Sequence, residues 1–277
     1  MITQKAYAKV NLSLRITGKR EDGYHLLDTL MQTVSLYDTV SVEKTESGIQ
    51  VVCDGISGEQ NICYKACQLF FTHTKIKGGA RVIISKNIPV AAGLGGGSAD
   101  AAAVLRILNK LYGDVLSFDE LCELGLKLGA DVPFCIKGGT ARVNGIGEKL
   151  VFINPELKIH LVLLKLKDKP STAQMYKEFD AKGNFAYNSD TVLKMVKSLE
   201  KSDFKGFCDN FYNDFASVWD IEEETKALLC CGAEKVSLSG SGPTVMGVYE
   251  SKEKADVAAE KLSNRFSCVY SVTAVNE

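Results

Sequence analysis

Four of the five residues from 93 to 97 are glycine, and no other feature constrains the fold of this chain as strongly. The cluster leads into an alanine-rich segment whose later leucines recur at helical spacing. Glycine lets a backbone take positive φ angles and approach a ligand closely. We expect Ser98 to cap the helix, whose first amide groups then form a site suited to phosphate. A flexible surface turn capped by Ser98 is the alternative interpretation.

The spacing around these glycines argues against the two commonest nucleotide loops. The P-loop pattern G-x-x-x-x-G-K-[ST] does not occur, and no lysine precedes Ser98. A dinucleotide-binding loop would need glycine or alanine where Ser98 stands, and it would follow the first strand of the chain. An NAD-dependent dehydrogenase is therefore disfavoured.

Charge and cysteine content exclude several other classes. The 277 residues include 33 Lys and Arg against 34 Asp and Glu, a formal net charge of −1, so general attraction to nucleic acid or anionic lipid is not expected. The nine cysteines form no C-x-x-C pair and the three histidines lie far apart, which predicts buried free thiols and no zinc site. No apolar signal core and no run of about 20 apolar residues occurs, so we expect a cytoplasmic protein.

The order of strand and helix patterns predicts an α+β protein. Residues 8–16 alternate between apolar and polar side chains, as in a half-buried strand. Further strands are predicted at 30–42, 49–53, 81–84, 140–144, 148–153, 159–164 and 267–274, with two more around 235–249. Helices are predicted at 61–72, from 98, from a capping box at 117–120, and at 171–180, 189–200, 203–217, 220–230 and 252–264. The early strands come in antiparallel-looking runs. The pattern of predicted elements changes near residue 155, after which helices become more frequent, and this predicts two domains, 1–155 and 156–277.

Three more segments could carry chemistry. Asp131, in LGADVPF, is a carboxylate fixed between small and apolar residues, although a turn or helix-cap aspartate is the simpler interpretation. Lys9 and Asn11 point to the same side of the first strand and could act together. The alternative interpretation is that they lie on an ordinary solvent-exposed face of that strand. The segment 238–244, LSGSGPT, is either a hairpin turn or a second ligand-contacting loop.

Together these segments resemble one superfamily. The stretches AYAKVNLSLRITGKREDGYHLLDTL, IPVAAGLGGGSADAAAVLRILN, LGLKLGADVPF, GIGEKL and SLSGSGPT are similar to the kinases of galactose, homoserine, mevalonate and phosphomevalonate (GHMP kinases). Within it they are most similar to the branch that phosphorylates a cytidine-diphosphate-linked methylerythritol. The resemblance implies a two-domain α+β fold with mixed sheets packed against helices and the active site in the cleft between domains. Residues 1–155 would bind ATP, and 156–277 the substrate.

The resemblance also implies a role for each matching residue. Lys9 and Asp131 match the catalytic pair of the family. Tyr24 and Tyr176 match aromatic residues that stack on the cytosine ring, and His25 matches a residue that holds it. The other matching substrate residues are Asn11, Thr172, Gly240 and Ser241. The matching ATP residues are Asn61, Lys86, Pro89, Val90, Ala91, Ala92, Gly93, Leu94, Gly95, Gly96, Gly97, Ser98 and Ala99.

The implied reaction transfers the γ-phosphate of ATP to the 2-hydroxyl of the methylerythritol moiety, in the non-mevalonate route to isoprenoid precursors. Mg²⁺ would accompany ATP. Ser98 is the one protein ligand we can name for it, and no tightly bound metal or prosthetic group is expected. We expect a monomer or weak homodimer. Two alternatives remain open, namely a related kinase acting on a mevalonate-like or homoserine-like alcohol, and a non-catalytic nucleotide-binding regulator. The Tyr24-His25 pair disfavours the first, and the presence of both Lys9 and Asp131 disfavours the second.

Overall fold

A computed structural model describes residues 1–166, 170–183, 185 and 190–276. The chain forms two compact units that are interleaved along the sequence. The first unit comprises Met1–Lys9, Leu36–Val90 and Gly95–Gly138, and the second comprises Val10–Ser35, Ala91–Leu94 and Gly139–Glu277. The long strands β1 (Ile2–Lys19) and β2 (His25–Thr45) each contribute to both units. The expected division near residue 155 into ATP-binding and substrate-binding halves stays a prediction.

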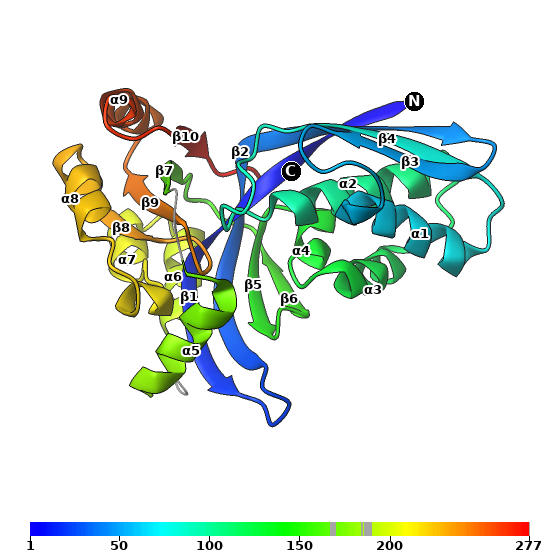
Figure 1. The fold of residues 1–277 in the computed structure, drawn as a ribbon. Helices are drawn as coiled ribbons and strands as arrows, with labels where there is room; N and C mark the ends of the chain where they lie inside the picture. Colours follow the sequence, from blue (N-terminus) through cyan, green and yellow to red (C-terminus); the bar gives the residue numbers. More distant parts are fainter. Residues whose placement is uncertain (167–169, 184, 186–189, 277) are drawn as a thin grey trace. The chain divides into compact units, whose positions relative to one another are not determined.

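Part of a six-stranded sheet forms one side of the first unit (Figure 1). Strand β4 (Gly79–Ser85) pairs antiparallel with the later part of β2 and parallel with β3 (Gly48–Cys53). Alternate residues of these strands, such as Val40, Val42 and Val82, are fully buried, because side chains in a strand point to opposite faces. The apolar face of this sheet therefore needs a cover.

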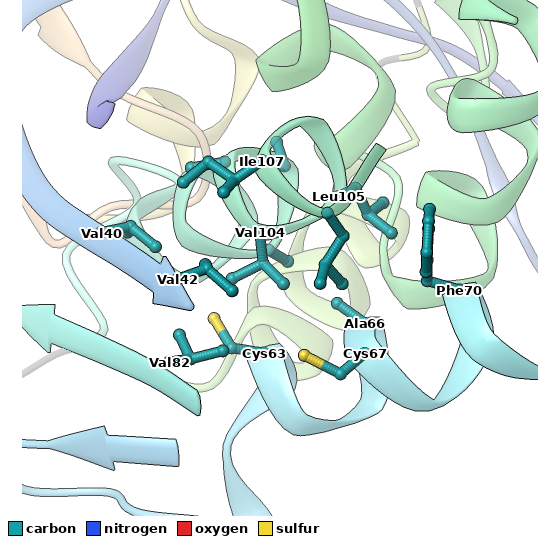
Figure 2. Packing of buried hydrophobic residues seen from close by; sticks show 14 of the residues in the cluster. Val40, Val42, Cys63, Ala66, Cys67, Phe70, Val82, Val104, Leu105 and Ile107 are labelled. Carbon is teal, nitrogen blue, oxygen red and sulfur yellow. The ribbon is translucent and has the colours of Figure 1, made fainter. Parts of the chain in front are cut away.

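Helices α1 (Ile62–Thr74) and α2 (Gly96–Leu111) supply that cover. Figure 2 shows Cys63, Ala66 and Phe70 of α1 in one cluster with Val104 and Leu105 of α2 and the valines of β2 and β4. Alanine has the highest helix propensity and its small side chain lets helices approach closely, so the alanine run of α2 suits its buried position. Short α3 (Phe118–Leu128), α4 (Val132–Lys137) and a 3-10 helix (Gly58–Gln60) complete the unit.

Two sets of strands form the second unit. Strand β5 (Thr140–Gly145) pairs antiparallel with the early part of β2 and with β6 (Lys149–Ile153). A separate four-stranded sheet has the order β10-β7-β9-β8. Its strands are β7 (His160–Lys165), β8 (Lys235–Leu238), β9 (Thr244–Tyr249) and β10 (Val269–Thr273), and the three pairings are all antiparallel.

The core of this unit joins that second sheet to its helices. Buried Met175 and Phe179 pack with Val162 and Val245 in one cluster. The helices are α5 (Thr172–Lys182), α6 (Thr191–Glu200), α7 (Phe204–Asp209), a 3-10 helix (Asp214–Ser217), α8 (Glu222–Cys230) and α9 (Lys252–Ser263). Burying one such side chain stabilises the fold by about 1.5–3 kcal/mol.

The α+β prediction is confirmed, with two local corrections. The helix expected at 203–217 is confirmed only over α7 and is not continuous, because the backbone at Tyr212 and Asn213 pairs with Leu14 of β1 before the 3-10 helix begins. Helix α4 was not predicted. It begins directly after Asp131, with Pro133 in its first turn, where proline is compatible with a helix. The first residue of the helix expected at 189–200 lies outside the described residues.

All nine cysteines are free thiols, as expected, but only Cys63, Cys67 and Cys208 are buried. Cys230 is exposed and the others are half-buried, so the expectation of general burial is wrong. Among the described residues, no helix combines the length and the apolar character needed to cross a membrane.

Candidate active site

The glycine loop ends where α2 begins. The helix starts at Gly96, and Gly95 occupies the capping position with φ +66°. The expected capping role of Ser98 is wrong, because the left-handed turn at Gly95 already redirects the chain and the Ala99 amide donates to the Gly95 carbonyl at 2.8 Å. Ser98 lies inside the first turn. The amide groups of that turn have no earlier carbonyl in the helix to bind, which makes this helix start suited to an anion.

Lys9 and Asp131 form an ion pair in the first unit beside this loop. The distance from Lys9 Nζ to Asp131 Oδ2 is 3.1 Å. The Lys9 side chain is 6% exposed, which contradicts the solvated-face interpretation, whereas that of Asp131 is 31% exposed. Asp131 stands at the start of α4 but its side chain makes no capping hydrogen bond there. One carboxylate is thus held by a buried cation and stays open to a further partner.

Glycine at position 95 allows Lys9 to reach this position. A Cβ atom on Gly95 would lie 2.8 Å from Cγ of Lys9, which is closer than real side chains approach. The positive φ of Gly95 independently favours glycine. The expected phosphate loop and the expected catalytic lysine are therefore in direct contact.

Lys86 lies between two buried carboxylates of the first unit. Its ammonium group donates to Asp38 and, at 2.7 Å, to Asp100 of α2. Asp38 also accepts the backbone amides of Asn87 and Ile88. A Cβ atom on Gly96 would lie 3.5 Å from Lys86 Nζ, so this cluster stands against the start of α2.

The titration of this cluster is unusual. Burial raises the pKa of the Asp100 carboxyl to about 7, although Lys86 acts in the opposite direction. Its Oδ1 atom is a buried oxygen without a hydrogen-bond partner among the described residues. Burial alone would lower the pKa of Lys86, but the two carboxylates outweigh it and raise that pKa. Sequence reasoning identified Lys86 and missed both aspartates.

The other predicted ATP residues differ in their contacts and in their exposure. Asn61 caps α1, because its side-chain oxygen accepts from the Cys63 amide at 2.9 Å and its amide donates to the Ile56 carbonyl. In the segment before the loop, the side chains of Ala92 and Leu94 are buried whereas Val90 is exposed. Pro89 and Gly97 are half-buried and exposed, respectively, and Ala99 is buried. The buried residues Ala92, Leu94 and Ala99 could therefore contact a ligand through their backbone atoms but not through their side chains.

In the second unit, residues 91–94 pack against the loop that follows β8. Ser239 Oγ donates to the Gly93 carbonyl at 3.1 Å, and Thr244 Oγ1 donates to the Ala92 carbonyl at 2.7 Å. A Cβ atom on Gly93 would lie 2.7 Å from the Gly242 oxygen. The segment expected to be either a turn or a second ligand loop is therefore joined to the glycine loop itself.

The predicted substrate residues form a connected set in the second unit. Asn11 Oδ1 would lie 3.5 Å from a Cβ atom on Gly240, and Asn11 Nδ2 donates to Thr29 Oγ1 at 2.9 Å. The hydroxyl groups of Ser241 and Thr172 are 2.9 Å apart. Asn11 is 2% exposed, which again excludes a solvated strand face.

Thr172 also lines a surface hollow of about 620 Å³ with the three predicted cytosine residues. Its lining residues are Lys19, Gly23, Tyr24, His25, Leu27, Ile146, Thr172, Ala173, Tyr176, Lys177 and Asp180. These lining residues include two lysines, Lys19 and Lys177, and one aspartate, Asp180, so the charge of the hollow favours an anionic ligand.

The aromatic rings of the hollow differ in their packing: two stack on each other and the third is exposed. The His25 and Tyr176 rings stack with centroids 4.3 Å apart and an interplanar angle of 18°. Tyr24 is 62% exposed, which leaves its flat ring accessible. Sequence reasoning missed Asp180, which binds His25, and Lys19, which binds Asp180. A signal for Asp180 was present, since Thr172, Tyr176 and Asp180 follow one another at the four-residue spacing of a helix face.

Comparison with known proteins agrees with this arrangement. The sequence profile of the GHMP kinases N terminal domain matches residues 61–139, and that of the GHMP kinases C terminal domain matches 195–268. The chain is 43% identical to a 4-diphosphocytidyl-2-C-methyl-D-erythritol kinase of Clostridium botulinum (strain Eklund 17B / Type B) and 42% identical to that of Clostridium novyi (strain NT), in each case over 96% of this chain and 97% of the relative.

A solved structure extends the likeness to the backbone. The crystal structure of a 4-(cytidine 5'-diphospho)-2C-methyl-D-erythritol kinase matches the whole of both chains with a TM-score of 0.85 and 32% identity. Sequence identity at this level over nearly the full length establishes kinship, and both halves of the superfamily pattern are present. The chain belongs to the 4-diphosphocytidyl-2-C-methyl-D-erythritol kinase family, a branch of the GHMP kinases.

Proposed function

We propose that this small-molecule kinase transfers the γ-phosphate of ATP to the 2-hydroxyl of 4-diphosphocytidyl-2-C-methyl-D-erythritol. The products are ADP and the 2-phosphate of that alcohol, an intermediate of non-mevalonate isoprenoid precursor synthesis. The observation that carries the proposal is the Lys9–Asp131 pair, 3.1 Å apart, with Lys9 packed against Gly95 of the glycine loop. A carboxylate and a buried cation beside a phosphate-type loop are the groups that alcohol phosphorylation requires.

Asp131 would orient the attacking hydroxyl and accept its proton. An ionised aspartate is a weak base, so the proton moves late, as the new O–P bond forms and the bond from the γ-phosphorus to the leaving ADP oxygen breaks. Lys9 would hold Asp131 in position and offset negative charge on the phosphoryl group in flight. The half-open Asp131 carboxylate is consistent with this role.

The start of α2 would bind the ATP phosphates through backbone amides, with Gly93 to Ala99 around them. Magnesium, when bound with ATP, supplies charge neutralisation at the phosphates. Among the described residues there is no cluster of three or more Asp, Glu, His or Cys side chains that could hold a metal ion. The Ser98 hydroxyl in the first turn is the protein ligand we propose, and it fits an ion held mainly by ATP oxygens and water.

The hollow of the second unit would receive the cytidine diphosphate end of the substrate. Tyr24, His25 and Tyr176 line it together, and flat aromatic rings suit a pyrimidine. Thr172 joins this hollow to Ser241, so the diphosphate would follow Thr172, Ser241 and Gly240 toward Asn11. Binding energy from this remote group would then align the reacting hydroxyl.

The rival functions differ in what they need. A kinase for a mevalonate-like or homoserine-like alcohol has no use for an aromatic hollow that carries two lysines. A nucleotide-binding regulator needs the loop but not the Lys9–Asp131 pair.

One experiment tests the proposal directly. The purified protein is mixed with Mg-ATP and the cytidyl alcohol, and the products are followed by ³¹P NMR. We expect ADP together with a new phosphomonoester whose coupling assigns it to the 2-position. ADP without a new ester, or an ester at another hydroxyl, would contradict it.

A further inference from the structure

Asp180 of α5 binds two other residues of the hollow at once. Its Oδ1 atom lies 2.6 Å from Nε2 of His25, and its Oδ2 atom lies 2.6 Å from Nζ of Lys19. The His25 side chain is 8% exposed, so its imidazole is held in a largely dry position. Nothing in the proposed reaction so far uses Asp180.

The carboxylate fixes the state of the imidazole. Partial burial opposes ionisation of Asp180, but hydrogen bonds from Lys19 and His25 outweigh it and lower its pKa, so the group is an ionised acceptor at neutral pH. An acceptor-only partner requires the proton of the His25 ring to sit on Nε2. In the neutral ring Nδ1 is then an acceptor, and the structure gives Nδ1 no hydrogen-bond partner among the described residues.

The ring plane is fixed as well. Tyr176 covers one face of the imidazole at 4.3 Å, and the Tyr176 ring in turn meets Phe215 edge-on with centroids 4.9 Å apart. Tyr176 and Asp180 are one turn apart on α5, so both lie on one side of that helix. From this side Tyr176 stacks on the plane of the imidazole, and Asp180 binds its Nε2 atom.

We propose that Asp180 is a positioning residue of the cytidine site, which fixes the Nε2–H tautomer and the orientation of His25 and holds the Lys19 ammonium in the hollow. This inference rests on the proposed function, because it takes the hollow to be the site of the cytidine diphosphate. A preset imidazole and ammonium reduce the ordering cost of binding, so their loss weakens binding of this one ligand.

The kinetic test uses Asp180→Ala, with Asp180→Asn as a second variant that keeps the side-chain shape. Alanine suits the interior of α5, so we expect the fold to persist. The KM for the cytidyl substrate should rise about tenfold or more, whereas kcat and the KM for ATP stay within about twofold. The matched control is Glu178→Gln on the same helix, whose carboxylate binds Gln174 and lies outside the hollow, and it should leave all three constants unchanged.

A spectroscopic readout separates positioning from mere support of the fold. The chain has only three histidines, so ¹⁵N-histidine labelling resolves His25 from His73 and His160. We expect the neutral His25 ring to be the Nε2–H tautomer in the unmodified protein and to become a tautomer mixture in Asp180→Ala. An unchanged tautomer, or equal KM effects on both substrates, would overturn the role of Asp180. A wild-type protein that fails to phosphorylate the cytidyl alcohol would instead overturn the proposed function.

Discussion

Lys9 Nζ stands 3.1 Å from Asp131 Oδ2, and this pair joins the first strand of the chain to the start of α4. The cation is almost fully buried while the carboxylate remains accessible. A purely structural ion pair would gain nothing from an open carboxylate. The unequal exposure is what a group that must meet a substrate hydroxyl requires.

The first prediction concerns Asp131. We expect Asp131→Asn to keep affinity for ATP and the cytidyl substrate but to lower turnover by roughly two to four orders of magnitude, because the proton acceptor is lost. Calorimetric titration measures the two affinities and a coupled ADP assay measures turnover. Asp119→Asn, at an exposed aspartate of α3, is the control. Turnover equal to that of the control would remove Asp131 from the mechanism.

The second prediction tests the contact between Gly95 and Lys9. Gly95→Ala should destabilise the protein by about 1–2 kcal/mol because of its left-handed backbone, and should lower kcat roughly 10- to 100-fold by displacing Lys9. Gly97→Ala is the matched control for stability, since among the described residues its Cβ atom would meet only Ile62, at an ordinary 3.7 Å, inside a helix. Denaturant unfolding without ligands compares the two. Equal stability of both variants would contradict the strained fit at Gly95.

The third prediction concerns the exposed Tyr24 ring. We expect Tyr24→Ala to raise the apparent KM of the cytidyl substrate about tenfold or more and that of ATP by less than about twofold, because one stacking surface for the base is lost. Phe118→Ala, at an exposed aromatic residue outside the hollow, should change neither value. Equal increases in both KM values would place Tyr24 outside the cytidine site.

The fourth prediction follows from the buried carboxyl of Asp100. Its folded pKa of about 7 lies above the ordinary value of 3.8, so the folded chain holds a proton that the unfolded chain releases between these values. Stability from this group is complete below the ordinary value and is lost as the pH rises through about 7. The titratable groups that interact electrostatically with Asp100 include Lys86, Asp38 and the thiols of Cys53, Cys63 and Cys135.

Thermal unfolding at several pH values between 4 and 8 tests this prediction. Asp100→Asn cannot titrate, so its melting temperature should fall less than that of the wild-type protein as the pH rises through this range. Asp119→Asn serves again as the control and should follow the wild-type curve. Parallel curves for Asp100→Asn and the wild type would show that Asp100 does not titrate in this range.

Much of this site could be predicted from sequence because its elements are local. Glycines 93–97 and the alanines after them predict a loop and a helix from backbone propensity alone, and the alternation at 8–16 predicts a strand that carries Lys9. The resemblance to a known family then supplied residues, such as Tyr24 and Tyr176, that no local pattern distinguishes from ordinary surface aromatics.

The remaining features depend on contacts between distant segments. Asp38 and Asp100 are 62 residues apart, and nothing in either segment shows that Lys86 lies between them. Likewise, Asp180 is 155 residues from His25 along the chain. The capping prediction at Ser98 failed for a local reason, because a left-handed glycine ended the loop three residues earlier.

The most direct test of the account compares kcat/KM for three alcohols with the same enzyme preparation and Mg-ATP. The cytidyl-linked methylerythritol should exceed mevalonate and homoserine by at least about three orders of magnitude, because only it can use the hollow formed by Tyr24, His25 and Tyr176. A kcat/KM for mevalonate or homoserine equal to or above that of the cytidyl substrate would contradict the account.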